Sequence, residues 1–280
     1  MRRVSFVLAL VGVAVVASGC GSSANTDVVA SVNDVELDRD TFEELVNASE
    51  AANGTPVDSQ PDAQAARTDG DTARSVVGKW VTGELVRADL DATGATIPEV
   101  DSSITGAERS DAEFNVLATT WVAQGDAVLG DQALETWYDQ GPAKSEVACV
   151  QHILVANKSD AQAVLDRLDA GEAFADVAAN ASLDSQSAAQ GGALGCRPLS
   201  AFTASFIPEF VEGSLAAEVG VPTQPVTSQF GQHIIRVMPF DELSSDDLIL
   251  TRLIALGHWH DVQVDPQIGA WESGRVEPLG

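Results

Sequence analysis

Hydrophobic and polar positions alternate along residues 27–37 with the two-residue period of a strand, and Asn33-Asp34 interrupts the alternation. An Asn-Asp pair between two apolar runs predicts a β-hairpin. Residues 38–50 place apolar side chains on one helical face and acidic residues in the first turn, which predicts a helix because carboxylates stabilise its N-terminus. Residues 51–71 are rich in Ala, Gly, Pro, Asp and Gln without an apolar period, so we expect a surface loop.

Longer stretches with helical spacing follow this loop. Apolar residues predict helices over residues 72–90, which Gly94 ends, and over residues 108–129. A third helix is expected over residues 131–138, before the stop at Gly141-Pro142. We interpret their tryptophans as core residues, with a platform for bound peptides as the alternative: Trp80, Trp121 and Trp137.

The centre of the chain, residues 149–240, has a different pattern. It opens and closes with short runs of strand-forming residues, which carry His152 and His233. A helix-like segment and a Gly191-Gly192 turn lie between the two runs. The pattern predicts one compact domain with two strands and a polar pair at its middle.

The last part of the chain returns to a helical period. Residues 245–256 predict a helix, residues 261–264 a strand, and residues 266–271 a turn. His258 and His260 form a possible metal-binding pair, but no further Cys or His lies nearby and zinc normally takes three or four protein ligands. We therefore expect surface histidines and no metal site.

Composition limits the possible partners of the chain. Its 280 residues are enough for one large or two small domains, and a hydrophobic content of 45% predicts that most of them fold. The formal net charge is −27, which opposes binding to nucleic acid and adsorption to anionic lipid by charge. We also find no nucleophile elbow, phosphate loop or dinucleotide fingerprint, and we predict no cofactor.

The N-terminus has the features of an export signal. Arg2 and Arg3 precede an apolar run over residues 6–17 that is short for a bilayer span. Residues 17–20, Ala-Ser-Gly-Cys, resemble a bacterial lipoprotein signal, in which the cysteine is lipidated after cleavage, although Ala17 stands where Leu is more frequent. We predict a signal peptide over residues 1–19, lipidation of Cys20 and a tether over residues 20–26. The alternative is an ordinary secretory signal with a chance cysteine.

Several segments of the central stretch resemble, together and in order, a parvulin-type peptidyl-prolyl isomerase domain. Each is weak alone, but together they span about 90 residues. The resemblance implies a four-stranded antiparallel sheet surrounded by helices, the first two near residues 159–169 and 173–180. The segments are His152-Ile153-Leu154-Val155, Phe174-Ala175-Asp176-Val177-Ala178, Ser182-Leu183-Asp184, Gly191-Gly192-Ala193-Leu194-Gly195, Phe206 to Phe210, Pro225-Val226 and Gly231-Gln232-His233-Ile234-Ile235.

The same resemblance implies the site residues. His152, Asp184 and His233 correspond to the polar catalytic positions of the family. For the two histidines, a direct catalytic role and a structural or tuning role both remain open. The resemblance places three further residues in a pocket for the proline ring: Leu194, Phe206 and Phe210.

The chain also departs from the family pattern. Ala193 stands where Asp is frequent, Gln232 where Tyr or Ile is frequent, and Cys196 near a common aromatic position. Where phosphate-selective members carry a basic cluster, this chain offers only Lys158, so we expect no preference for phosphorylated clients. An exported setting permits a disulfide between Cys149 and Cys196, and their pairing stays open.

The hairpin and acidic helix near the start resemble extracytoplasmic foldases of the SurA and PrsA type. This resemblance implies an α+β chain in which a parvulin-like domain at residues 145–240 is inserted into a mainly helical domain, residues 27–144 and 245–280. We expect a membrane-anchored lipoprotein foldase, on the outer side of the bacterial cytoplasmic membrane, that isomerises X-Pro bonds of exported proteins. Two alternatives are a catalytically silent peptide-binding chaperone and a structural envelope lipoprotein.

Overall fold

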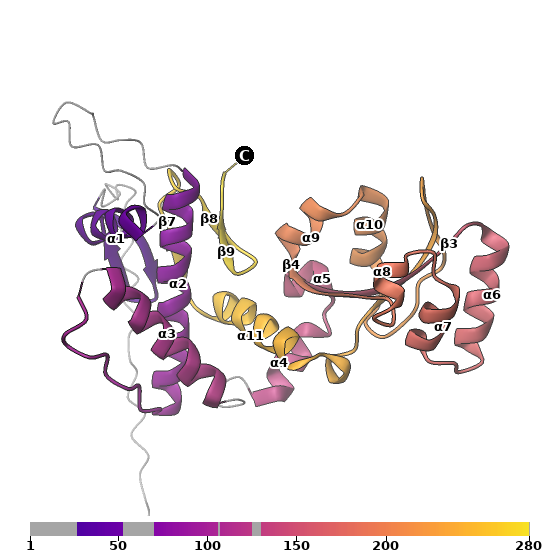
Figure 1. Cartoon of the computed structure of the whole chain (residues 1–280), viewed down its shortest axis with the longest axis horizontal. Helices are drawn as coiled ribbons and strands as arrows, with labels where there is room; N and C mark the ends of the chain where they lie inside the picture. Colours follow the sequence, from indigo (N-terminus) through magenta and orange to yellow (C-terminus); the bar gives the residue numbers. More distant parts are fainter. Residues whose placement is uncertain (1–26, 53–69, 106, 125–129, 280) are drawn as a thin grey trace, which may run out of the picture.

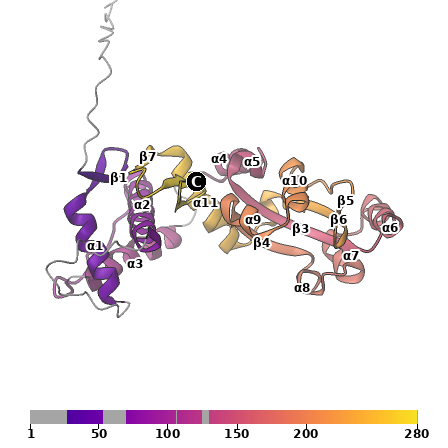
Figure 2. The same cartoon turned by 90° about the horizontal axis from the view of Figure 1, so that it is seen from above.

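The computed structural model describes residues 27–52, 70–105, 107–124, 130–279. Two lobes lie side by side along the long axis of the molecule (Figure 1). The first lobe combines the beginning and the end of the chain, and the second holds the middle (Figure 2). The predicted signal peptide, the predicted tether and Cys20 lie outside the described residues.

The first lobe is built on a three-stranded sheet of order β2-β1-β7. The predicted hairpin is confirmed, since Val28–Val32 (β1) pairs antiparallel with Val35–Asp38 (β2) around the Asn33-Asp34 turn. Val262–Val264 (β7) pairs with the other edge of β1. A strand from the end of the chain therefore completes a sheet that begins at its start.

Two helices pack on this sheet, Arg39–Ala52 (α1) and Gly70–Thr93 (α2), and Ala107–Gln124 (α3) packs on both of them. The long helix α2 is central and buries Val77, Val81 and Leu85 completely. It ends where the sequence predicted, at Gly94, whose φ of 67° suits a residue without a side chain. Trp121 is buried in this core as expected, whereas Trp80 is only partly buried at its edge.

The second lobe contains the predicted four-stranded antiparallel sheet, of order β4-β3-β6-β5, so the expected fold class is confirmed. Seven short helices of the described residues surround it or lead into it. The strands are Val147–Val155 (β3), Ala193–Pro198 (β4), Val226–Ser228 (β5) and Gly231–Val237 (β6). The helices are Pro142–Ser145 (α5), Lys158–Asp169 (α6), Phe174–Ala181 (α7), Ser185–Ala188 (α8), Leu199–Ser205 (α9), Pro208–Ala216 (α10) and the 3-10 turn Phe240–Glu242 (η1).

Two helices join the lobes: Gly130–Tyr138 (α4) and Ser245–Trp259 (α11). One apolar cluster combines residues of α4, β3, β6 and α11, including Trp137, Val147, Val237 and Ile254. At the same place a disulfide joins Cys149 of β3 to Cys196 of β4. The Cys196 amide donates a hydrogen bond of 2.9 Å to the Asp247 carboxylate of α11. Strand β4 is thus hydrogen-bonded to α11, the helix that returns to the first lobe.

The C-terminal predictions need correction. The turn expected over residues 266–271 is found at residues 266–268, but Ala270–Glu272 (β8) begins within the expected range and pairs with Arg275–Glu277 (β9) in a hairpin that was not predicted. Helix α11 continues three residues beyond the predicted end. His258 therefore lies in the last turn of α11 rather than on a strand. In this position the centroid of its ring lies 5.9 Å from that of Trp137.

Candidate active site

The two histidines of the central domain come from adjacent strands, β3 and β6. His152 pairs in register with Ile235, and His233 with Leu154, so the histidines are diagonal neighbours on the sheet. Alternation along each strand directs both rings to one face, whereas Ile153 and Ile234 between them face the other. The apolar neighbours therefore fix which face the polar pair occupies.

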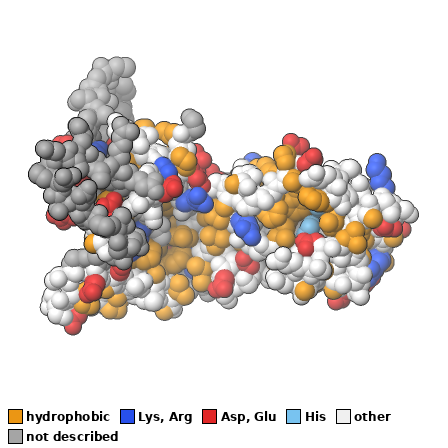
Figure 3. Space-filling model, turned by 45° about the horizontal axis from the view of Figure 1, so that its top comes forward, with side chains coloured by type: hydrophobic (Ala, Val, Ile, Leu, Met, Phe, Trp, Pro, Cys, Tyr) orange, Lys and Arg blue, Asp and Glu red, His pale blue; other side chains and the backbone are white. Residues whose placement is uncertain are grey.

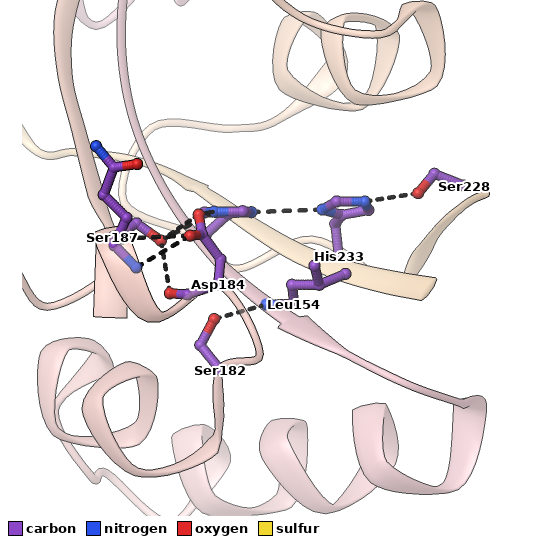
Figure 4. A network of polar contacts seen from close by, with 8 residues as sticks. Leu154, Ser182, Asp184, Ser187, Ser228 and His233 are labelled. Carbon is purple, nitrogen blue, oxygen red and sulfur yellow. Dashed lines mark hydrogen bonds and ion pairs between the residues drawn. The ribbon is translucent and has the colours of Figure 1, made fainter. Parts of the chain in front are cut away.

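A continuous chain of polar contacts runs through the two rings (Figure 4). The Nδ1 atoms of His152 and His233 lie 3.4 Å apart. His152 Nε2 lies 2.9 Å from Asp184 Oδ2, and His233 Nε2 lies 2.7 Å from Ser228 Oγ. The Ser228 hydroxyl also accepts a hydrogen bond from the Phe230 amide at 3.1 Å.

This chain assigns one tautomer to each histidine. His152 Nε2 faces a carboxylate and must donate, so a neutral His152 accepts at Nδ1. His233 then donates from Nδ1 and accepts from the Ser228 hydroxyl at Nε2. Burial lowers the pKa of His152, although Asp184 opposes the effect, and burial together with His152 lowers the pKa of His233 to about 4. Both rings are therefore neutral at pH 7.

Asp184 is held at the rim by hydrogen bonds from Gln186, Ser187 and His152. Its carboxylate caps helix α8 by accepting from the Gln186 amide at 3.2 Å. The Ser187 hydroxyl donates to Asp184 Oδ2 at 2.7 Å, and that hydroxyl also lies 3.1 Å from His152 Nε2. Burial raises the pKa of Asp184, but the hydrogen bonds from Ser187 and His152 outweigh it and leave the pKa below its ordinary value.

An apolar cluster adjoins the histidine pair. The Phe210 ring is 2% exposed and stands edge-on to both imidazoles, with centroids 5.3 Å from each. Phe206 lies 5.3 Å from Phe210, and Leu194 packs against the same cluster. The three residues that the resemblance placed in the proline pocket are therefore neighbours, and all three lie beside the histidines' face of the sheet.

The two phenylalanines of this cluster come from different helices. Phe206 and Phe210 are four residues apart, a spacing that would put them on one face if a single helix contained both. Phe206 instead ends α9 in an extended conformation, and α10 begins at Pro208. The helical conformation is disfavoured for a residue that precedes a proline. The chain therefore bends at Ile207, and the rings of Phe206 and Phe210 meet from two helices.

One glycine, Gly192, allows a close approach of the backbone on which the site depends. At Gly192 a Cβ atom would lie 2.6 Å from the His152 carbonyl oxygen, and φ is 84°. Its carbonyl accepts the His152 amide hydrogen bond at 2.9 Å. A side chain at this position would push the Leu194 strand away from His152.

Two residues of the site, Ser187 and Ser228, were not predicted from the sequence. Ser187 follows Asp184 by three residues, which is the spacing between a capping residue and the end of the first helical turn. The sequence alone therefore indicated a contact between these two residues. Ser228 carries no local signal, because its contact with His233 arises from the pairing of β5 with β6.

The surface around the site is mainly hydrophobic. In Figure 3 a histidine and an acidic side chain lie within hydrophobic surface on the lobe that contains the four-stranded sheet. Such a surface suits an apolar ring beside a small polar group. Over the described ranges there is no group of three or more His, Cys, Asp or Glu that could hold a metal ion. None of the helices described there is long and apolar enough to cross a bilayer.

Comparison with known proteins identifies this lobe. Residues 152–239 match the family model described as Rotamase: PPIC-type PPIASE domain, so the parvulin resemblance is confirmed for this part of the chain. The foldase protein PrsA of Caldanaerobacter subterraneus subsp. tengcongensis is 36% identical over 123 residues, which are 42% of this chain and 39% of that protein. The chain thus spans less than half of the length of the curated relatives that it matches.

Two solved structures are also similar. The parvulin NmPin of Nitrosopumilus maritimus is 32% identical, with 33% of this chain and 96% of that chain covered and a TM-score of 0.30. The peptidylprolyl isomerase PrsA of Bacillus anthracis is 22% identical, with 65% and 74% covered and a TM-score of 0.31.

Proposed function

We propose, on the premise that residues 152–239 are a parvulin-type domain, that the protein is a peptidyl-prolyl cis-trans isomerase acting as a foldase on exported proteins. The observation that carries the proposal is the packing of the Phe210 ring against both neutral histidines within an apolar cluster. This packing supports a binding site in which an apolar ring lies beside polar atoms that an amide can meet.

The chemistry follows from the bond to be rotated. An X-Pro amide resists rotation because its C–N bond has double-bond character, with a barrier of about 18–20 kcal/mol. The planar amide carries partial negative charge on oxygen, and rotation removes it. A catalyst therefore needs to bind the twisted amide better than either planar form.

The site residues can supply that preference. Leu194, Phe206 and Phe210 hold the proline ring and exclude water, which disfavours the charge-separated planar form. Asp184, ionised and fixed by Ser187 and His152, faces the preceding carbonyl and repels the oxygen most strongly while the amide is planar. The histidines act as positioning residues that hold Asp184 and present neutral rings to the pocket.

An isomerisation assay on a proline peptide tests the proposal. Wild-type protein should accelerate exchange, and Asp184→Ala and Phe210→Ala should each lower kcat/KM by about 100-fold, or about 2.7 kcal/mol of transition-state stabilisation. Asp176→Ala is the matched control, because Asp176 is exposed in the same lobe. No acceleration by the wild type would reject the isomerase and favour the silent chaperone.

The first lobe has a proposed role of its own. We propose that residues 27–144 and 245–280 form one helical domain that holds unfolded segments, with residues 145–240 inserted. The pairing of β7 with β1 supports this division, since it joins the two ends of the chain in one sheet. The clients are exported proteins with X-Pro bonds, without a preference for phosphorylated residues.

We also propose an anchor at the N-terminus. Cleavage after residue 19 and lipidation of Cys20 would hold the protein on the outer side of the bacterial cytoplasmic membrane, with acyl chains supplying the affinity that the net charge of −27 does not. Fractionation of cells that express Cys20→Ala tests the anchor. Unchanged membrane association of the variant would contradict it.

A further inference from the structure

An exposed arginine stands at one end of the apolar cluster that adjoins the histidines. Arg197 lies on the edge strand β4 and pairs in register with Ala148 of β3. Directly paired residues of an antiparallel sheet project to the same face, and alternation along β3 puts Ala148 on the face of His152. Ala148 is accordingly a buried member of the apolar cluster. Arg197 therefore projects to the face of the sheet that carries the histidines.

The guanidinium of Arg197 lies over an aromatic ring of this cluster. Its Cζ atom is 5.8 Å from the centroid of the Phe206 ring, a distance at which a cation is attracted to an aromatic face. Phe206 ends α9, which lies beside β4 (Figure 2). The Phe206 ring is in turn 5.3 Å from Phe210, whose ring stands beside both histidines. The positive charge is thus held at one end of the cluster, and the histidines lie at the other.

Arg197 differs from the other arginines of the central domain, each of which is paired with a glutamate: Arg167 with Glu172 and Arg236 with Glu242. Arg197 makes no ion pair with any residue that the structure describes. Asp247 of α11 reaches the same strand, but its carboxylate accepts a hydrogen bond from the Cys196 amide. In a chain with a net charge of −27, an uncompensated positive charge beside the candidate site is available to an acidic group from outside.

We propose that Arg197 is a specificity-determining residue, which favours clients with a Glu or Asp side chain within two residues of the proline. The inference rests on the proposed isomerase function, because it assumes that the client proline lies on the cluster of Leu194, Phe206 and Phe210. A guanidinium presents a planar fork of N–H donors that matches the two oxygens of a carboxylate. The contact with Phe206 orients the guanidinium in advance, which reduces the entropy that is lost on pairing.

The distances determine how far from the proline the acidic residue lies. An extended client covers about 3.3–3.6 Å per residue, so two residues cover about 7 Å. This length matches the separation between a proline ring bound against Phe206 and the guanidinium 5.8 Å from that ring. At the other end of the cluster the Asp184 carboxylate repels an acidic residue of the client. The preference is therefore confined to one side of the proline, and chain direction decides which side.

Matched nine-residue peptides test the proposal. Each peptide has one central proline and either Glu or Gln at one of the four positions within two residues of it, so the two members of a pair differ in charge and hardly in shape. Fluorescence anisotropy gives the Kd, and the isomerisation assay gives kcat/KM. At low ionic strength, where screening is weak, we expect wild-type protein to bind the Glu peptide about fivefold more tightly than the Gln peptide on one side of the proline.

Two variants of Arg197 separate recognition of the client from packing. Arg197→Gln should reduce the ratio of the two Kd values to about one, and Arg197→Lys, which keeps the charge without the planar fork, should retain part of the preference. If Arg197 only covered the Phe206 ring, its replacement by Gln would change the Kd of both peptides alike and leave their ratio unchanged.

Lys158→Gln is the matched control, because Lys158 is exposed in the same domain at the start of α6, which packs on the opposite face of the sheet. This variant also loses one positive charge, and it should keep the fivefold ratio. Equal binding of Glu and Gln peptides by the wild type at all four positions overturns the proposal, as does an unchanged ratio in Arg197→Gln or an equal loss in Lys158→Gln. A wild type that prefers Glu peptides but accelerates no exchange rejects the isomerase and leaves the role of Arg197 in place. Acceleration without a Glu preference gives the reverse conclusion.

Discussion

The two faces of the four-stranded sheet differ in character, although neighbouring residues of the same strands build them. On one face Ile153 and Ile234 are fully buried against α6 and α7. On the other face His152 and His233 lie beside Phe210, next to an apolar cluster that includes Leu194 and Phe206. A period of two residues is enough to produce both surfaces from β3 and β6.

The difference shows how a small domain can desolvate a polar pair. The apolar face buries Ile153 and Ile234 and so fixes the two strands, and the histidines form a hydrogen-bonded pair on the other face. Because the strands are fixed, both rings stay in a largely dry environment, where burial lowers the pKa of each. We therefore assign stability mainly to one face and chemistry to the other.

A cavity on the closed face gives the largest expected effect. Ile153→Ala removes three carbons at a site with 0% exposure and should lower the free energy of unfolding by about 2–5 kcal/mol, measured by urea denaturation. The kcat/KM of the folded variant, measured at low temperature, should stay close to that of the wild type. A decrease of tenfold or more in the kcat/KM of the folded variant would contradict the assignment of stability and chemistry to different faces of the sheet.

The disulfide should have the next largest effect, because it closes a loop of 47 residues between the central strand β3 and the edge strand β4. Replacing both cysteines with Ser should lower the free energy of unfolding by about 2–4 kcal/mol. The check is the urea midpoint with and without reductant. Reductant should lower the midpoint of the wild type and leave that of the Cys149→Ser, Cys196→Ser protein unchanged. An insensitive wild type would contradict the bond.

The sequence predicted the parts of the molecule that short local patterns specify. The hairpin around Asn33-Asp34, the end of α2 at Gly94 and the sheet of the central domain are all confirmed. These features depend on turn chemistry or on a motif series in which each segment supports the others.

Features that depend on contacts between distant segments were missed. Ser228 meets His233 only because β5 pairs with β6, and no spacing along the chain predicts that contact. The C-terminal hairpin is a different case. Its strands have three residues each, too few to display an alternation, but Ser273-Gly274 has positive φ at both positions and is a recognised turn dipeptide. The turn dipeptide therefore indicated a hairpin in the sequence, but the strands are too short for an alternation of apolar residues to support that prediction.

The smallest expected effect is a pH dependence of the free energy of unfolding, which arises from His233 on the face of the sheet that carries the histidines. The folded-state pKa of His233 is about 4, below its ordinary value of 6.5, so the unfolded chain binds more protons between these values. Stability should be fully present above pH 6.5 and should fall toward pH 4, with a slope of at most about 1.4 kcal/mol per pH unit from this group.

Urea denaturation of wild type and His233→Gln between pH 7 and pH 4.5 isolates this contribution, since the loss of net negative charge on acidification affects both proteins alike. The variant should lose part of the slope whatever its absolute stability, and His258→Gln, at an exposed position of the helix between the lobes, should keep it. Equal slopes in wild type and His233→Gln would mean that His233 is not held neutral by burial. In that case water would reach the histidines more than their burial indicates. The two faces of the sheet would then differ only in how their side chains pack.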